Sequence, residues 1–389
     1  MTAESAQRFE ALEAQAASLV DVFKRAGYEQ VAPSVIQPAD VFLDQIGERI
    51  RSRTYVFTDL AGEELCLRPD LTVPASRLYL ERHPNADVEA RYCYNGSAFR
   101  FQPAGGTEVH PREFRQAGIE CFGVADRESA DVEVVLLAVE ALRTAGLTDF
   151  NIQFGDIALF YALLDALELP ERWRLKLRHY FWRPPVFHAL LARLARGERP
   201  QGNGPAAELA AGLAKLDQEA AEEKVAAYLE EQGVPLAGNR SLTEITARLV
   251  DLGADLSSDP LRKEMATVID YYLSVSGPPK ESLDRIAMIA KGAGIDLGPA
   301  LEATVRRFER LEQNGVDLAR ASFTTEFGRN LEYYTGLVFQ VGAEGQRDTG
   351  PIAGGGRYDD LLSHVGAPRN VPAVGSAIHT QRLLAAVER

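Results

Sequence analysis

The order in which strand-like and helix-like segments follow one another constrains this chain more than any single motif. Strand-like runs occur between residues 53 and 155 and again from residue 321 to residue 341, at spacings typical of hairpins. Between these blocks, from about residue 166 to residue 317, apolar residues recur at helical steps. Strands joined by short turns pair antiparallel. The order therefore predicts an α+β fold, with an antiparallel sheet, flanking helices and a helical insertion.

These patterns set the boundaries of the expected parts. We place a first core part at residues 1–165, a helical insertion at 166–317 and a second core part at 318–389. We expect helices at residues 7–26, 75–81 and 130–145, and strands at 53–59, 64–68, 91–101, 113–124, 150–155, 321–324 and 337–341. The segment 28–35 contains Pro33, which lacks a ladder donor, and is expected at a sheet edge or an interface. The insertion shows no pattern to which a chemical role can be assigned.

The charge and the cysteine count exclude several classes of protein. The chain has 389 residues and a net charge of −14, without a long basic run, and this argues against a nucleic-acid partner. Cys66, Cys93 and Cys121 lack metal-ligand spacing and predict buried thiols in a reducing, cytoplasmic compartment. The scattered histidines predict no metal site, and no cofactor is expected. No segment approaches the roughly 20 apolar residues that a membrane span needs.

One polar stretch lies where an apolar strand would be usual. The sequence FGRNLEYYTG (327–336) places a cation, an anion and two phenols before the expected strand, and AGGGRYD (353–359) follows closely. Burying such groups costs free energy, so they usually gather in order to contact a ligand. The alternative is a hairpin with a charged rim and a tight glycine turn, because Gly-rich loops alone are weak evidence.

The strand at 113–124 carries a second polar face. Phe114, Gln116, Gly118 and Glu120 share one side of it, which is either the solvated side of an antiparallel sheet or part of a site. Further polar patches are RPDLT (68–72), FR (99–100) and REFRQ (112–116). Carboxylates can bind an ammonium group, an arginine can bind a carboxylate, and a Glu/Tyr pair can bind both nitrogens of an imidazole.

Five blocks in the same order make the chain resemble histidyl-tRNA synthetase, a class II aminoacyl-tRNA synthetase. Segments 27–33, 99–123 and 374–383 are similar to the three class II motifs, and segments 329–335 and 353–358 to the two boxes peculiar to the histidine enzymes. The resemblance covers about residues 9–165 and 320–384. It implies a class II synthetase-like sheet and a homodimer formed through this core, with the first motif at the interface.

The resemblance also implies roles for residues at matching positions. Asp70, Thr72 and Gln116 would hold the α-amino group of histidine, and Glu120 and Tyr334 would bind its imidazole. No catalytic residue is expected.

Further positions would complete this set. Tyr333 would lie near the imidazole, and Arg329 would contact the histidine carboxylate, or the reacting phosphate if ATP were used. Arg100 and Arg382 would correspond to the arginines that grip ATP phosphates, and we include Arg100 among the residues expected to bind histidine.

Departures from the family pattern argue against an adenosine pocket. Gln102 stands where the family has an acidic residue that contacts adenine, and the loop from there to Arg112 is different. His379 and Gln381 replace a glycine and an acidic residue, and an imidazole in place of that glycine obstructs the nucleotide. The sequence ends at Arg389, whereas a synthetase continues for roughly 100 residues, a further small domain that reads the anticodon. We therefore expect no C-terminal anticodon-binding domain.

A histidine-binding core of this kind resembles the family of ATP phosphoribosyltransferase regulatory subunits. That resemblance implies a non-catalytic protein that activates a short-form catalytic subunit, in a hetero-octamer, and relays feedback inhibition by L-histidine in the first step of histidine biosynthesis. Two alternatives stay open. One is an enzyme that adenylates histidine for a non-tRNA acceptor, motivated by Arg100, Arg329 and Arg382. The other is a binding module that has lost histidine. The intact set of Asp70, Thr72, Gln116, Glu120 and Tyr334 argues against it.

Overall fold

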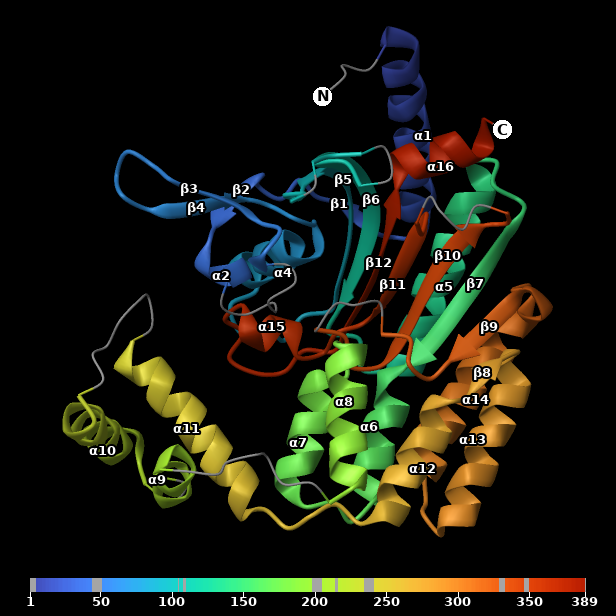
Figure 1. Ribbon diagram of the computed structural model, residues 1–389. Coiled ribbons are helices and arrows are strands. Elements are labelled where there is room, and N and C mark those ends of the chain that lie inside the picture. Colours follow the sequence, from blue (N-terminus) through green and yellow to red (C-terminus); the bar gives the residue numbers. More distant parts are fainter. Residues whose placement is uncertain are drawn as a thin grey trace. The chain divides into compact units, whose positions relative to one another are not determined.

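Two β-sheets, one of nine strands and one of three, organise the larger part of the computed structural model (Figure 1). The structure describes residues 5–43, 51–103, 105–107, 110–197, 205–213, 216–233, 241–328, 333–345 and 350–388. Residues 1–162 and 273–389 form one compact unit, and residues 163–272 form a second. Both sheets belong to the first unit, whereas the described residues of the second form helices and connecting loops.

The large sheet has the strand order β1-β5-β6-β12-β11-β10-β7-β9-β8. Its strands are β1 (Glu29–Gln30), β5 (Ala90–Phe99), β6 (Glu113–Phe122), β7 (Phe150–Asp156), β8 (Ser276–Gly277), β9 (Ala321–Thr324), β10 (Leu337–Ala343), β11 (Ala353–Arg357) and β12 (Ala373–His379). Neighbours from β5 to β7 pair antiparallel, as do β8 and β9. The pairs β1–β5 and β7–β9 are parallel, so the sheet is mixed and mainly antiparallel.

The seven strands expected from the sequence pattern are present, whereas β2, β8, β11 and β12 were not expected as strands. The edge position expected for the segment 28–35 is confirmed, because β1 is the first strand of the sheet order. The interpretation of residues 353–357 as a tight glycine turn is wrong. These residues form β11, which is buried along its whole length between β10 and β12. A run of glycines has no β-strand propensity, so its place in the sheet comes from pairing on both sides.

Helices cover the large sheet, and two of them share one of its faces. The helices of this unit are α1 (Ala6–Arg25), α2 (Asp40–Leu43), α4 (Thr72–Arg82), α5 (Arg127–Thr144), α13 (Pro279–Ala293), α14 (Gly298–Gln313), α15 (Leu361–His364) and α16 (Thr380–Val387), with the 3-10 helix η1 (Leu318–Arg320). α1 and α5 pack against each other and against β5, β6, β11 and β12 (Figure 1). Gly27, which follows the C-cap residue of α1, has a φ of 89°, a conformation that glycine adopts without strain.

The small sheet contains β2 (Ile36–Pro38), β3 (Tyr55–Thr58) and β4 (Glu64–Leu67), in the order β2-β4-β3. β3 and β4 form the hairpin predicted for residues 53–68. The three cysteines are free and buried, as expected.

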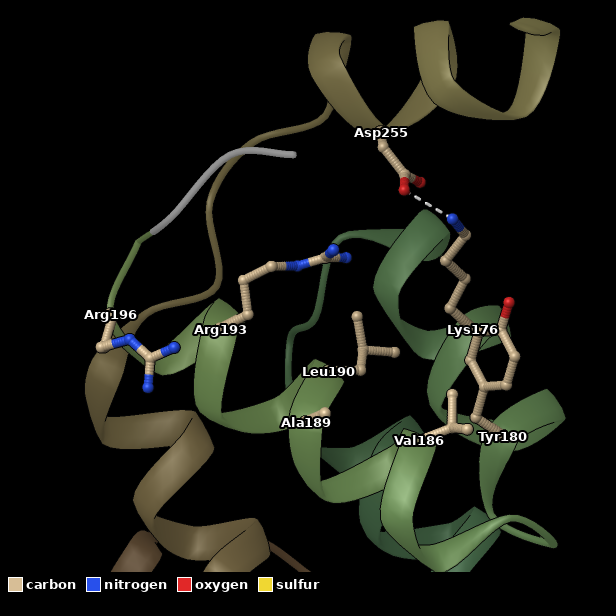
Figure 2. A pocket seen from close by; sticks show the side chains of 8 residues that line it. All are labelled: Lys176, Tyr180, Val186, Ala189, Leu190, Arg193, Arg196 and Asp255. Carbon is tan, nitrogen blue, oxygen red and sulfur yellow. Dashed lines mark hydrogen bonds and ion pairs between the residues drawn. The ribbon is translucent and has the colours of Figure 1, made fainter. Parts of the chain in front are cut away.

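The second unit is built from helices α7 (Glu171–Tyr180), α8 (Pro184–Ala195), α9 (Pro205–Leu213), α10 (Gln218–Glu231) and α11 (Leu242–Ser257), with the adjoining parts of α6 (Ile157–Ala166) and α12 (Lys263–Leu273). α7 and α11 are joined by ion pairs, one of which links Lys176 to Asp255 (Figure 2). This unit is shorter than the insertion placed at 166–317, because α13 packs on β9 and α14 on α5 in the first unit. Over the described stretches, no helix has both the length and the apolar character that crossing a bilayer requires.

Candidate functional site

Gln116 and Glu120 of β6 face away from α1. Arg115 forms an ion pair with Glu13 of α1, and side chains alternate along a strand. Gln116 and Glu120 therefore point to the opposite face of the sheet. There α4 packs over β5 and β6 through an apolar cluster of Leu71, Ala75, Tyr94, Ala98 and Phe114. Because Glu120 is 0% exposed, the interpretation of this face as a solvated surface is wrong at that residue.

Glycines on the central strands leave space above the sheet for the side chains of this site. A Cβ on Gly375 of β12 would lie 1.7 Å from Oε2 of Glu120, and a Cβ on Gly356 of β11 would lie 3.0 Å from the ring of Tyr334. Gly356 and Gly375 are opposite each other in the β11–β12 register. The carboxylate of Glu120 and the ring of Tyr334 therefore lie over neighbouring positions of the sheet.

The carboxylate of Glu120 accepts hydrogen bonds from three hydroxyl groups. Oε1 accepts a hydrogen bond from the Tyr94 hydroxyl at 2.8 Å, and Oε2 accepts one from the Tyr358 hydroxyl. Burial raises the pKa of Glu120 to about 7, although hydrogen bonds from Tyr358, Thr72 and Tyr94 oppose the shift. The carboxyl group therefore changes protonation in the same pH range as a free imidazole.

Two acceptor oxygens among the residues expected to bind histidine lack a hydrogen-bond partner among the described residues. They are Oδ2 of Asp70 and Oε1 of Gln116, and both atoms are buried. The other oxygen of Asp70 accepts from the backbone N–H of Val73 at 3.2 Å, at the start of α4. Asp70 lies close enough to Glu120 to raise its pKa. Buried acceptors without donors cost free energy, so this arrangement suits a ligand that brings N–H groups.

Three tyrosines form an aromatic wall beside the carboxylate. The ring centroids of Tyr333 and Tyr334 are 4.8 Å apart, and both rings lie near Tyr358, at 5.8 and 6.5 Å. All three side chains are at most 7% exposed. Tyr333 and Tyr334 precede β10 and Tyr358 follows β11, so the antiparallel β10–β11 pair brings them together.

The end of β5 and the start of α16 provide positive charge. The Arg100 guanidinium lies 4.8 Å above the ring of Phe114 and donates a hydrogen bond from Nε to the carbonyl of Pro69. The imidazole of His379 stacks on the same ring, with centroids 5.1 Å apart. Burial, Arg382 and Arg100 lower the pKa of His379 to about 3. This imidazole is therefore neutral and fills space beside two guanidinium groups.

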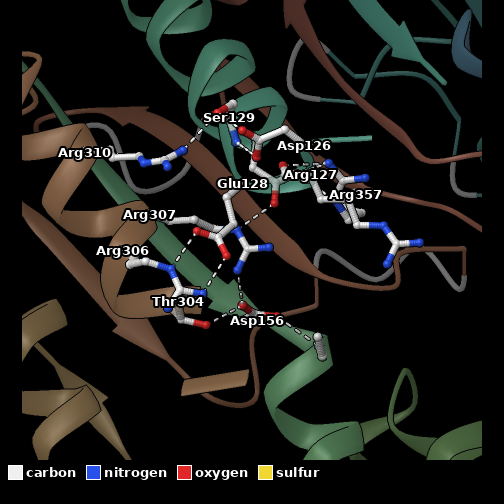
Figure 3. Close-up of polar contacts among 12 residues, drawn as sticks. Asp126, Arg127, Glu128, Ser129, Asp156, Thr304, Arg306, Arg307, Arg310 and Arg357 are labelled. Carbon is white, nitrogen blue, oxygen red and sulfur yellow. Dashed lines mark hydrogen bonds and ion pairs between the residues drawn. The ribbon is translucent and has the colours of Figure 1, made fainter. Parts of the chain in front are cut away.

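A network of buried ion pairs links β11, which precedes Tyr358, to the helices packed on the sheet. Arg357, the last residue of β11, donates from Nε to Oδ1 of Asp131 at 2.8 Å. The other oxygen of Asp131 accepts from Nε of Arg307 at 2.7 Å, and Arg307 lies 3.9 Å from Asp156, which also accepts from Thr304 at 2.8 Å (Figure 3). Burial raises the pKa of Asp156. The network ties β11 to α5, α14 and β7.

The structure thus brings together Asp70, Thr72, Glu120 and Tyr334 and puts Gln116 on the same face. Arg329 lies outside the described residues. Sequence reasoning missed two residues that contact Glu120 directly, Tyr94 and Tyr358. The feature of the sequence that could have revealed them is the pairing of strands. Tyr94 is opposite Gly118 in the β5–β6 register, and a Cβ on Gly118 would lie 2.6 Å from the Tyr94 hydroxyl.

The assembled groups can bind a small zwitterion with a polar ring. The two donor-free acceptors suit an ammonium group, a carboxyl with a pKa near 7 suits an imidazole N–H, and Arg100 supplies positive charge for a carboxylate. Among the described residues, no cluster of His, Cys, Asp and Glu could hold a metal ion.

Comparison with known proteins gives the family. The family model described as histidyl-tRNA synthetase matches residues 4–260 and 246–383. Among solved structures, one described as an ATP phosphoribosyltransferase regulatory subunit/histidyl-tRNA synthetase from Bacillus halodurans C has a TM-score of 0.67 at 20% identity, covering 100% of this chain and 82% of that chain. The histidyl-tRNA synthetase of Nostoc sp. PCC 7120 has a TM-score of 0.62 at 16% identity, covering 99% and 72%. At these identities the structures show a shared fold.

The sequence relatives are closer. A protein of Mesorhizobium japonicum named ATP phosphoribosyltransferase regulatory subunit is 35% identical over 371 residues, covering 95% of this chain and 96% of the relative. One of the same name from Rhizobium rhizogenes is 36% identical over 369 residues, with 95% and 96% covered. The chain therefore belongs to the family of ATP phosphoribosyltransferase regulatory subunits, which has the histidyl-tRNA synthetase fold.

Proposed function

We propose that this protein is a non-catalytic regulatory subunit that binds L-histidine on the glycine-rich face of its large sheet. In this role it activates a short-form ATP phosphoribosyltransferase catalytic subunit and carries the feedback inhibition of that enzyme by histidine. The observation that supports the proposal most directly is the site around Glu120. There a buried carboxyl with a pKa of about 7 lies near an Asp70 oxygen that has no donor among the described residues.

The proposed pose assigns each end of histidine to a different part of the site. Asp70 and Gln116 accept from the α-ammonium group through their unpartnered oxygens, with the Thr72 hydroxyl beside them. Glu120 accepts from an imidazole N–H, and Tyr334 and Tyr333 enclose the ring. An uncharged analogue of the ammonium would leave Oδ2 of Asp70 buried without a donor, so selectivity for an α-amino acid follows.

The carboxylate of the ligand is assigned to the cationic side of the site. We infer that Arg100, together with Arg329, attracts it. His379 stacks on Phe114 between the guanidinium groups, and this imidazole leaves no open glycine position for an adenine nucleotide to approach. The stacked His379 therefore favours a binding protein over an enzyme that adenylates histidine.

Regulation follows from linkage between histidine binding and assembly. Histidine can inhibit a partner subunit when its affinity differs between the two states of the complex, typically by a coupling free energy of about 1–3 kcal/mol. We propose a homodimer through the synthetase-like core and a hetero-octamer with the catalytic subunit in the cytoplasm. The ion network behind β11 gives the site a rigid connection to α5 and α14.

The decisive experiment combines binding and activity. Isothermal titration of the purified chain with L-histidine should give saturable binding, and Glu120→Gln should weaken it strongly. Added to a short-form catalytic subunit, the chain should raise the rate of phosphoribosyl transfer, and histidine should lower that rate again.

Two results would contradict this proposal. Histidine-dependent ATP–pyrophosphate exchange by the chain alone would establish the adenylating enzyme instead. Absence of histidine binding, both alone and with the catalytic subunit, would leave a binding module that has lost this ligand.

A further inference from the structure

The helical unit of residues 163–272 contains an unusually basic helix pair within an acidic protein. From residue 171 to residue 196 the chain has seven Lys or Arg residues and one acidic residue, Glu171, although the whole chain has a net charge of −14. These residues form α7, α8 and the turn between them. Such a concentration of charge attracts anions unless neighbouring carboxylates neutralise it.

The basic residues of α7 are neutralised within the unit. Arg172 and Lys176 bind Asp251 and Asp255 of α11, with Nε of Arg172 2.8 Å from Oδ1 of Asp255 and Nζ of Lys176 3.0 Å from Oδ2 of Asp251. Arg174 and Arg178 both bind Asp165, the latter at 2.5 Å. Every basic side chain of α7 therefore has a carboxylate partner.

Arg193 of α8 differs from these residues. Unlike them, it forms no ion pair with a carboxylate in the described part of the chain, and its buried Nε, like those of Arg174 and Arg178, has no hydrogen-bond partner there. Its side chain extends into a pocket of about 440 Å³, with the Lys176–Asp255 pair on the opposite side (Figure 2). Because two cations already bind Asp255, that carboxylate is compensated without Arg193.

The pocket combines charge with an apolar wall. It is lined by Lys176, Tyr180, Val186, Ala189, Leu190, Arg193, Arg196 and Asp255. Three cations and one carboxylate give these residues a net charge of +2. Val186, Ala189 and Leu190 add apolar surface, and Tyr180 adds a hydroxyl donor. The volume falls in the range of about 300–1,000 Å³ that small-molecule sites occupy.

We propose that this pocket is a second ligand site of the protein, which binds a small phosphate monoester. A phosphate monoester carries a charge of about −1.5 to −2 at pH 7, and Arg193 offers it a guanidinium that no carboxylate of the described residues neutralises. The planar guanidinium of Arg193 presents donors in the geometry that phosphate oxygens accept. The organic group of the ester packs on Leu190 and Val186. This site is separate from the proposed histidine site and does not depend on it.

The experiment uses the full chain at constant ionic strength, because exposed charges also attract anions without specificity. Phenyl phosphate, inorganic phosphate and benzoate are titrated by calorimetry into wild-type protein, Arg193→Gln and Arg248→Gln. Arg248 is an exposed residue of α11 in the same unit but outside the pocket. It is therefore a matched control for the loss of one charge.

We expect one phenyl phosphate per chain, binding more tightly than inorganic phosphate or benzoate. Arg193→Gln should weaken it at least tenfold and Arg248→Gln less than twofold, with unchanged circular dichroism and histidine binding in both. Arg196→Gln, at the exposed end of α8, should also weaken the binding of phenyl phosphate.

Three outcomes would overturn the proposal: no saturable binding of phenyl phosphate, equal weakening by Arg193→Gln and Arg248→Gln, or binding of a polyglutamate peptide in place of the ester. The last would identify the basic helix pair as a surface for an acidic protein.

Discussion

Gly375 of β12 lies directly opposite Glu120 of β6, and a Cβ on this glycine would fall 1.7 Å from the Glu120 carboxylate. The absence of a side chain at Gly375 therefore leaves the space that the carboxylate of Glu120 occupies. Gly375→Ala should push Glu120 away from Tyr358 and abolish histidine binding, measurable by calorimetry. Overpacking of this kind typically costs about 1–3 kcal/mol of stability, so urea unfolding should detect it too.

Gly292→Ala provides the control for that substitution. Gly292 is in α13, and a Cβ there would have no heavy atom within 4 Å. Alanine in a helix is favoured over glycine by about 1 kcal/mol, so this variant should be at least as stable as wild type and bind histidine normally. Normal histidine affinity in Gly375→Ala would show that the space above Gly375 is not part of the site.

Asp70→Asn should separate binding from stability. Asn can keep the bond to the Val73 N–H, but it removes a buried negative charge that has one oxygen without a donor. The ligand-free protein should therefore become no less stable, whereas histidine affinity should fall. Loss of a charge-assisted hydrogen bond costs about 1.5–3 kcal/mol, which corresponds to roughly ten- to a hundredfold.

Asp126→Asn is the matched control for Asp70→Asn. Asp126 likewise accepts from a backbone N–H at the start of a helix, that of Ser129 at 3.0 Å, but it lies at the exposed start of α5. Its substitution should leave histidine affinity unchanged. A purely structural Asp70 would give the opposite pattern, with lower stability and unchanged affinity.

The pH dependence of the free energy of unfolding should reveal the titration of the Glu120 carboxyl group. Its pKa rises from 4.5 to about 7 on folding, so the folded chain binds more protons than the unfolded chain between these values. The contribution of Glu120 is fully present below pH 4.5 and is lost as the pH rises through about 7. The pKa of His379 falls from 6.5 to about 3, so its contribution is present above pH 6.5 and is lost toward pH 3.

These two contributions oppose each other between pH 4.5 and 6.5. In Glu120→Gln the opposing contribution of the carboxyl disappears. The free energy of unfolding should then rise more steeply with pH over this range than in wild type. Urea unfolding at several pH values measures the two slopes, and equal slopes would mean that Glu120 does not titrate near neutrality.

Asp131→Asn should be among the most destabilising single substitutions. Asp131 is 0% exposed and bridges Arg357 and Arg307, and removal of one partner from a buried pair costs about 3–5 kcal/mol. Glu128→Gln affects the nearby but partly exposed pair with Arg306 and should cost at most about 1 kcal/mol. Chemical denaturation of both variants tests the contrast, and similar losses would show that the network is not the support of β11.

The expected strands and the polar face of β6 could be predicted from the sequence, because each depends only on the periodicity of residues within one segment. Strand alternation alone puts Gln116 and Glu120 on one side. By contrast, β11 was not predicted as a strand, and a tight turn was one of the two interpretations, since a glycine run becomes a strand only through pairing with β10 and β12.

The contacts of Glu120 could not be predicted for the same reason. Tyr94 and Tyr358 contact Glu120 because strands that are far apart in the sequence pair in the sheet. Asp131, Arg307 and Arg357 come together through the packing of helices on the sheet. Such contacts depend on tertiary structure, which no local pattern records.

The parallel pairing of β7 with β9 has a consequence for how this family can vary. Parallel neighbours cannot be joined by a tight turn, so the chain must make a long excursion between Asp156 and Ala321. The whole second unit lies within that excursion. Insertions, deletions and even wholesale replacement there leave the strand register untouched. The segment that holds residues 163–272 can therefore change in length without changing the pairing of β7 with β9.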